Sequence, residues 1–243
     1  MMASFKNFSL LLALTTLFAC QTKTSNHNLF SLGAVRPSPL VLTTQIVSKN
    51  GQIVGEQQIE YLNSLLVRLQ QALSFKDKPN QLYKIILIDN PLPLAYLPGD
   101  GLIIISRGLV SIINNEAELA FIIAHEMAHE QLGHFELLAK NIQRRALLSD
   151  RSELELEADK YALDIITLAN YDPRAALSAL KVVYGASLIE EGEFKESIFK
   201  YPRLEERIDL IEMAIHASPW GSLSGTVNQR EFVAFKLSMA YKS

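Results

Sequence analysis

The sequence predicts an α+β fold, in which a mainly helical domain carries a small sheet. Two short β-branched runs, 82–89 and 102–105, are separated by an apolar segment and a Pro-Gly-Asp-Gly turn. After Ser106, apolar residues recur at helical spacing almost to the C-terminus. The chain has 243 residues, is 49% hydrophobic and carries a net charge of −3, which fits one globular domain of ordinary size. We therefore expect a small sheet packed on a helical body.

The N-terminus carries a candidate secretion signal. Lys6 precedes the apolar run 8–19, which is too short to span a bilayer and has the length of a signal-peptide core. The run ends in LFAC at 17–20, which resembles the lipobox of bacterial lipoproteins, where the signal peptidase cuts before a cysteine that then carries lipid. We interpret 1–19 as a lipoprotein signal peptide and Cys20 as the lipidation site. The alternatives are an ordinary signal peptide, or a buried helix with an incidental thiol.

Residues 20–50 are interpreted as the lipidated N-terminus and a flexible tether. They are rich in Ser, Thr, Asn and Gln and contain Pro37 and Pro39. Gln21 stands where an aspartate would signal retention in the inner membrane, so an outer-membrane lipoprotein facing the periplasm is expected. Two or three acyl chains on one cysteine anchor a protein stably.

The folded domain is expected over 51–243. Apolar residues at helical spacing indicate an amphipathic helix over 55–75. The run 82–89 is predicted to be a strand, and a hairpin-like unit leads through the turn at 98–101 into the strand 102–105. The remaining chain is predicted to be helical over 107–113, 116–140, 152–169, 173–187, 203–217 and 229–241.

The stretch AFIIAHEMAHEQLGH, 120–134, holds three of the five histidines of the chain. Asn115, with a glutamate three residues later, resembles a capping box, so the helix is predicted to begin near residue 116. Its residues are apolar almost all round, which indicates a buried helix. Burying His125, Glu126 and His129 there is costly unless these side chains have partners.

Their spacing indicates a zinc ion as that partner. His125 and His129 are four residues apart, so both imidazoles project from one face of the helix and can converge on one metal. Catalytic zinc keeps three protein ligands and one water. Glu126 can reach that water without binding the ion and act as its general base. This HExxH pattern is weak evidence alone, but the apolar surroundings argue against a surface helix, and we expect one Zn²⁺ per chain.

A third ligand is expected from SELELEADKYALDI, 152–165. The candidates are Glu153, Glu155 and Glu157. Asp159 follows Glu155 by four residues, so Glu155 can bind the metal while Asp159 accepts a hydrogen bond from a ligating imidazole. Glu157 lies about 200° around the helix from Glu155 and is the reserve candidate. The alternative is that Glu155 only caps the helix, as the last member of Ser152-x-x-Glu155.

These stretches resemble the HtpX-like and CAAX-prenyl-protease family of gluzincin metallopeptidases, in its small periplasmic lipoprotein branch. The resemblance covers about 85–212 and rests on five blocks in order: YLPGDGLIIISRGLV, NEAELAFIIAHEMAHEQLGH, ELEADKYALDI, ANYDPRAAL and RLEERI. It implies a zincin-type domain with ligands His125, His129 and Glu155, the base Glu126, and Asp159 as an outer acid. It also implies that an edge strand, here within 93–105, receives an extended substrate.

Two departures from the family pattern affect finer roles. Family members often have an asparagine before the turn, where this chain has Pro93 or Leu94, which leaves substrate backbone contacts there in doubt. Many also have a His-Pro pair before the arginine-containing segment, where this chain reads KYPRLEERI. Tyr201 stands in the place of that histidine. It is a candidate gate over the zinc or a donor to the oxyanion, with a packed aromatic as the alternative.

Two further residues have open roles. Arg207 either steadies the active-site helices or a developing charge, or forms a surface ion pair. The partners for such a surface pair are Glu205, Glu206 and Asp209. His134 lies five residues past His129, about 140° around a continuous helix, so it is not expected to reach the same ion. Family members commonly have a histidine there, and we interpret His134 as a structural hydrogen-bonding residue.

The predicted function is that of a zinc-dependent endopeptidase of the bacterial cell envelope. Its expected substrates are unfolded or misassembled envelope and outer-membrane proteins, and its expected membrane contact is the lipid on Cys20. A net charge near neutral without a basic block argues against nucleic acid as a partner. The alternative is a periplasmic chaperone or assembly factor whose zinc site is structural or weakly active.

Overall fold

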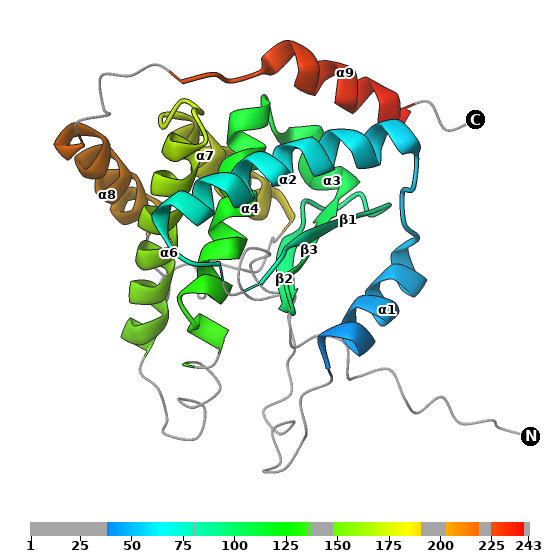
Figure 1. Cartoon of the computed structure of the whole chain (residues 1–243), viewed down its shortest axis with the longest axis horizontal. Coiled ribbons are helices and arrows are strands. Elements are labelled where there is room, and N and C mark those ends of the chain that lie inside the picture. The colour runs from blue at the N-terminus through cyan, green and yellow to red at the C-terminus, as the bar shows by residue number, and fades with distance from the viewer. Residues whose placement is uncertain are drawn as a thin grey trace, which may run out of the picture.

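The computed structural model describes residues 38–79, 81–135, 137, 148–190, 203–218 and 225–240. It confirms the predicted α+β fold: a mainly helical body with one small sheet (Figure 1). Cys20, the signal segment 1–19 and Tyr201 lie outside the described residues. Across the part of the chain that the structure describes, none of the helices combines the length and apolar character needed to cross a bilayer.

The described elements follow one another closely along the chain. The helices are α1 (Pro39–Asn50), α2 (Glu56–Lys76), α3 (Arg107–Ile112), α4 (Glu116–Gln131), α6 (Leu148–Leu168), α7 (Ala175–Glu190), α8 (Leu204–Ala217) and α9 (Gln229–Ala240). The strands are β1 (Lys84–Ile88), β2 (Ala95–Gly99) and β3 (Leu102–Ser106).

The sheet has the order β1-β3-β2. β2 and β3 form the expected antiparallel hairpin, with Ala95 opposite Ile105, whereas β1 pairs with β3 in parallel. Chain segment 51–53 covers part of the outer edge of β1, where the Ile53 N–H donates to the Leu87 carbonyl at 2.9 Å. Among the described residues, no strand pairs with the outer edge of β2. That edge therefore retains backbone groups for an added strand.

The hairpin turn is fixed by backbone geometry that favours glycine. Gly99, Asp100 and Gly101 have φ angles of 129°, 54° and 68°. At Gly101 a Cβ atom would lie 2.5 Å from the carbonyl oxygen of Leu82, so a larger residue does not fit. The Gly101 N–H points toward the Glu130 carboxylate, at 3.2 Å from Oε2. This contact ties the turn to α4.

The sheet packs on two sides. Leu87, Ile103 and Ile105 belong to the large core that it shares with the helices. Ile104, which points the other way along β3, forms a separate small cluster that Ile46 of α1 covers. α1 therefore lies on one face of the sheet, while most of the helices gather on the other (Figure 1).

The prediction of a flexible tether up to residue 50 is wrong over Pro39–Asn50, because these residues form α1. Ser38 is the N-cap, and its side chain accepts from the Val41 N–H at 3.4 Å. Pro39 stands at the first helical position, where its missing N–H costs nothing. Leu42 is 9% exposed. The polar composition of 21–50 concealed a Ser-Pro helix start followed by apolar residues at helical spacing.

Helix α4 is the centre of the molecule. Asn115 caps it by accepting from the Glu118 N–H at 3.0 Å, as the sequence predicts. Every residue from Glu116 to His129 is buried, so packing on all sides holds this helix in place. It packs most extensively against α6, and α7 lies along another side. These contacts form the framework of the site.

The predicted extension of this helix to residue 140 is wrong. α4 ends at Gln131, and the Leu132 N–H still donates to the Ala128 carbonyl at 2.9 Å. Gly133 then adopts a left-handed φ of 70°. A glycine just past the last helical turn is a common helix terminator. The chain leaves the helix axis here, which changes the direction of His134.

Candidate metal centre

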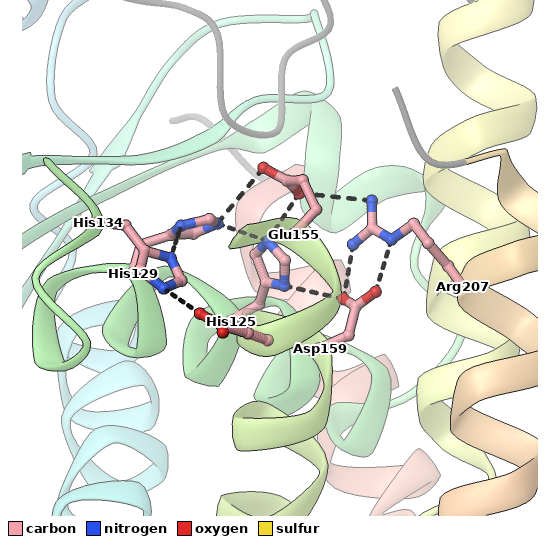
Figure 2. Close-up of polar contacts among 7 residues, drawn as sticks. His125, His129, His134, Glu155, Asp159 and Arg207 are labelled. Atoms are coloured by element: carbon pink, nitrogen blue, oxygen red, sulfur yellow. Dashed lines mark hydrogen bonds and ion pairs between the residues drawn. The ribbon is translucent and has the colours of Figure 1, made fainter. Parts of the chain in front are cut away.

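Three of the predicted site residues come together where α4 faces α6. His125 and His129 extend from α4 and Glu155 extends from α6, and all three are buried (Figure 2). His125 and His129 lie one helical turn apart on the same side of α4, as their spacing predicts. Glu155 is 7% exposed and approaches them from across the helix pair. The strong packing between α4 and α6 sets this approach.

The distances among the three donors suit a zinc ion. The Nε2 atoms of His125 and His129 are 3.0 Å apart. Glu155 presents one carboxylate oxygen to each imidazole, at 3.4 Å from His125 Nε2 and 3.6 Å from His129 Nε2. Atoms that bind one tetrahedral zinc at about 2.0–2.1 Å lie about 3.4 Å from one another. Two imidazoles and one carboxylate are also a typical catalytic zinc ligand set.

The outer nitrogen of His125 meets a buried acid. His125 Nδ1 lies 3.0 Å from Asp159 Oδ1, and both side chains are fully buried. This contact orients the ring with its Nε2 toward Glu155. Burial alone lowers the pKa of His125, but Asp159 and Glu155 outweigh it and raise the pKa to about 9. The position of His125 Nε2 therefore attracts positive charge.

Arg207, on α8, contacts the two acids that lie next to His125. It donates from Nε to Asp159 Oδ2 at 2.6 Å and from Nη2 to Asp159 Oδ1 at 2.6 Å. Its Nη1 lies 3.6 Å from Glu155 Oε2. Burial raises the pKa of Asp159, but Arg207 and His125 outweigh it and hold this pKa below its usual value. Of the two roles weighed for Arg207, the observed contacts fit the one that steadies the active-site helices (Figure 2).

The outer nitrogen of His129 meets a third histidine. His129 Nδ1 lies 2.9 Å from His134 Nδ1, and His134 Nε2 lies 3.3 Å from Glu157 Oε2. Burial and the neighbouring positive groups lower the pKa of His129 well below its usual value. A lowered pKa favours the neutral imidazole, which is the form that can bind a metal through a ring-nitrogen lone pair. His134 does not join the metal-binding group, in agreement with its position past the turn.

Glu126 is fully buried and follows His125 directly on α4. Neither of its carboxylate oxygens has full hydrogen-bond geometry with a described group. Burial raises the pKa of Glu126 to about 8, although His125 and the nearby Leu97 backbone N–H oppose the shift. Leu97 lies in β2, so the free carboxylate and the open edge strand adjoin each other. A buried carboxylate without a partner is costly, which indicates a functional role.

The other predicted candidates for the third ligand point elsewhere. Glu153 is exposed, and the Glu157 side chain is 64% exposed with its carboxylate on His134. The helix-capping alternative for Glu155 is wrong, because α6 already begins at Leu148, four residues before Ser152. Glu155 therefore lies within α6 and does not cap the start of this helix.

Sequence reasoning missed parts of the outer site. His134 was expected to form hydrogen bonds, but nothing in the spacing named His129 and Glu157 as its partners. The Leu97 N–H was missed because a backbone group leaves no sequence signal. The substrate contacts in doubt at Pro93 and Leu94 precede β2, and the Leu94 N–H donates to the Ser106 Oγ at 2.8 Å. This bond ties that segment to β3.

Family models match this region of the chain. The model for peptidase family M48 matches residues 56–149, and the model for peptidase U49 matches residues 113–217. The first covers the sheet and the HExxH helix. The second covers five residues of the candidate site: His125, His129, Glu155, Asp159 and Arg207. The matched residues are therefore similar to the domain of M48-type zinc metallopeptidases. The buried group His125, His129 and Glu155 could hold the zinc ion on which such metallopeptidases depend.

A curated protein is also similar. The mitochondrial metalloendopeptidase OMA1 of Arabidopsis thaliana is 24% identical over 152 residues, which cover 53% of this chain and 31% of that protein. This similarity agrees with the match to the model for peptidase family M48. Because the chain spans only about a third of that relative's length, the similarity is confined to this domain.

Proposed function

We propose that this protein is a zinc endopeptidase that cleaves unfolded or misassembled proteins of the bacterial cell envelope. One observation carries the proposal: the buried group His125, His129 and Glu155 lies beside the unpartnered carboxylate of Glu126. When bound, zinc supplies a Lewis acid that polarises the scissile carbonyl and makes a water molecule acidic. The site residues that would hold it are these three.

Each protein group has a separate task in this proposal. Glu126 takes the proton of the attacking water and returns it to the leaving amine, because it adjoins the metal ligands without being one of them. Asp159 and Arg207 hold His125 and Glu155 in place. The outer edge of β2 is the proposed binding site for the peptide, which would add as a further strand next to Glu126. Unfolded segments suit such an edge because they can become extended.

The test is digestion of unfolded casein by the purified protein. We expect cleavage that a zinc chelator abolishes and that added zinc restores. Glu126→Gln should lower the turnover about a thousandfold, which is within the usual range for loss of a general base, and should still bind zinc. The matched control is Glu153→Gln, an exposed glutamate on α6, which should cleave at the wild-type rate.

Two results would contradict the peptidase proposal. One is unchanged digestion by Glu126→Gln, which would indicate a contaminating protease. The other is a zinc-loaded wild-type protein that cleaves no unfolded substrate, while Glu126→Gln fully rescues an envelope defect. That second result would favour the chaperone or assembly factor.

The location is proposed from the sequence alone. We propose that the protein belongs to the small periplasmic lipoprotein branch of HtpX-like peptidases, anchored in the outer membrane through lipid on Cys20. The support is the short apolar run 8–19, whose last residues form the motif LFAC together with Cys20. The test is cell fractionation with Cys20→Ser. We expect wild type in the outer-membrane fraction and the variant outside it, and an unchanged distribution would contradict the anchor.

A further inference from the structure

The two histidines of the metal centre are supported from outside in different ways. His125 contacts Asp159, which Arg207 holds with two short hydrogen bonds. His129 contacts the imidazole of His134, a residue that neither the general-base assignment nor the ligand assignment uses. Figure 2 shows both arms spreading outward from the centre. The second arm needs its own explanation.

The contacts from His129 through His134 to Glu157 allow one consistent placement of the imidazole protons. If His129 directs the lone pair of Nε2 toward a metal, its proton is on Nδ1. That N–H donates to His134 Nδ1, at 2.9 Å. The proton of His134 is then on Nε2, which donates to Glu157 Oε2 at 3.3 Å. In this arrangement each N–H donates away from the metal centre. A single choice of tautomers therefore satisfies the hydrogen bonds from His129 to His134 and from His134 to Glu157.

The end of α4 makes this arrangement possible. On a continuous helix His134 would lie about 140° away from His129. The helix instead ends at Gln131, and the left-handed Gly133 redirects the chain. The His134 ring folds back under His129 and is fully buried. A fully buried imidazole next to a ligand histidine is held by packing, so it can fix the orientation of its neighbour.

We propose that His134 is a positioning residue, which holds the imidazole of His129 in the orientation and tautomer that bind zinc, and that Glu157 in turn orients His134. The inference rests on the zinc site of the proposed function. Glu157 and Glu155 belong to the same helix, so α6 supplies both a ligand and the outer end of this arm. Outer partners of ligand histidines commonly contribute about 10–100-fold to metal affinity.

The test measures zinc affinity rather than peptidase activity. Zinc is titrated into the metal-free full-length protein in competition with a coloured chelator. His134→Leu removes the acceptor and keeps the site apolar, so we expect binding about 10–100-fold weaker. His134→Asn places an amide oxygen near the position of Nδ1 and should recover part of the loss. Thermal unfolding of each metal-free variant, followed by circular dichroism, separates this effect from a general loss of stability.

Glu157 provides a test that leaves the core unchanged. Glu157→Ala should weaken zinc binding about threefold. This effect is smaller than the one expected for His134→Leu, because the Glu157 carboxylate is largely exposed. The control is Glu153→Ala, an exposed glutamate on the same helix, which should bind zinc like wild type. If both His134 variants fail to fold, the zinc affinities of Glu157→Ala and Glu153→Ala test the proposal instead.

A nuclear magnetic resonance experiment on the zinc-loaded protein adds a signature that packing alone does not give. In wild type, the His129 Nδ1 proton should give a sharp hydrogen-bonded imidazole signal, and His134→Leu should shift or broaden it. The proposal is overturned if folded His134→Leu binds zinc as tightly as wild type, or if Glu157→Ala and Glu153→Ala bind equally. Zinc binding without any cleavage of casein would refute the proposed function but not this role of His134.

Discussion

At the scale of residues, the site is organised by charge. Glu155 and Asp159 are buried carboxylates, and the fixed positive charge near them is that of Arg207. Asp159 and Glu155 also raise the pKa of His125 to about 9, which makes its imidazole the second positive group beside them. Buried acids need such nearby positive charge or hydrogen-bond partners. In the proposed function, a zinc ion held by His125, His129 and Glu155 would supply positive charge in place of the imidazole proton.

The identity of the third ligand gives the first prediction. Glu155→Ala removes a proposed zinc ligand, so the purified protein should lose almost all of its zinc. Glu157→Ala removes only an outer hydrogen-bond acceptor and should retain about one zinc per chain when zinc is in excess. Elemental analysis of the two variants beside wild type measures this directly. Loss of zinc from Glu157→Ala with full retention in Glu155→Ala would reverse the assignment.

Arg207 gives the second prediction. Arg207→Ala leaves the buried Asp159 without its charge partner, which should lower the free energy of unfolding by about 3 kcal/mol and weaken zinc binding. Arg207→Lys should restore little, because an ammonium cannot form both hydrogen bonds in the same plane. Chemical denaturation of the metal-free proteins measures the stability. The control is Arg203→Ala, whose side chain is 67% exposed and pairs only weakly with Glu206 on the surface.

At the scale of elements, α1 is the clearest difference from the sequence prediction. Leu42→Ala should lower the free energy of unfolding by about 2 kcal/mol, because this residue is 9% exposed and its loss leaves a cavity. Val41→Ala, at a position that is 46% exposed, should change it by less than about 0.5 kcal/mol. Denaturant unfolding of the two variants makes the comparison. Equal effects would show that α1 does not pack on the domain as described.

The start of α4 is held by a buried acid. Glu116 is 5% exposed and accepts hydrogen bonds from the hydroxyls of Tyr61 and Tyr171, from Asn228 and from Arg68. These donors come from α2, from the segment after α6 and from the segment before α9. Glu116 thus connects the histidine helix to three other parts of the fold.

This cluster gives a further prediction. Glu116→Ala leaves several buried donors without an acceptor, which should lower the free energy of unfolding by about 3 kcal/mol. The refolded variant should still bind about one zinc, because Glu116 lies at the opposite end of α4 from His129. Denaturant unfolding and zinc analysis check the two parts. The control is Glu60→Ala on the exposed side of α2, which should change stability little. A variant with normal stability would contradict the linking role.

At the scale of the whole molecule, the sequence predicted what depends on local pattern. The period of the apolar residues located the helices other than α1, although not all of their ends. The Pro-Gly-Asp-Gly turn located the hairpin, and Asn115 located the start of α4. The four-residue spacings placed His125 with His129 and Glu155 with Asp159 on their faces. Each of these features is determined by residues that are close to one another in the sequence.

The rest depends on contacts between distant segments. The parallel pairing of β1 with β3 places 84–88 beside 102–106 across the hairpin, and no local pattern shows it. The contact between His129 and His134 depends on where α4 ends, which a single left-handed glycine decides. The Arg207–Asp159 pair joins residues 48 positions apart. The sequence shows that Arg207 and Asp159 carry opposite charges, but it does not show that their side chains contact each other.

The most direct test of the account is X-ray diffraction from crystals of the zinc-loaded protein, measured at the zinc absorption edge. The predicted result is one strong anomalous peak at about 2.0–2.1 Å from the Nε2 atoms of His125 and His129 and from an oxygen of Glu155. A peak elsewhere, or three side chains turned apart with no shared ion, would contradict the claim that these residues form a catalytic metal centre.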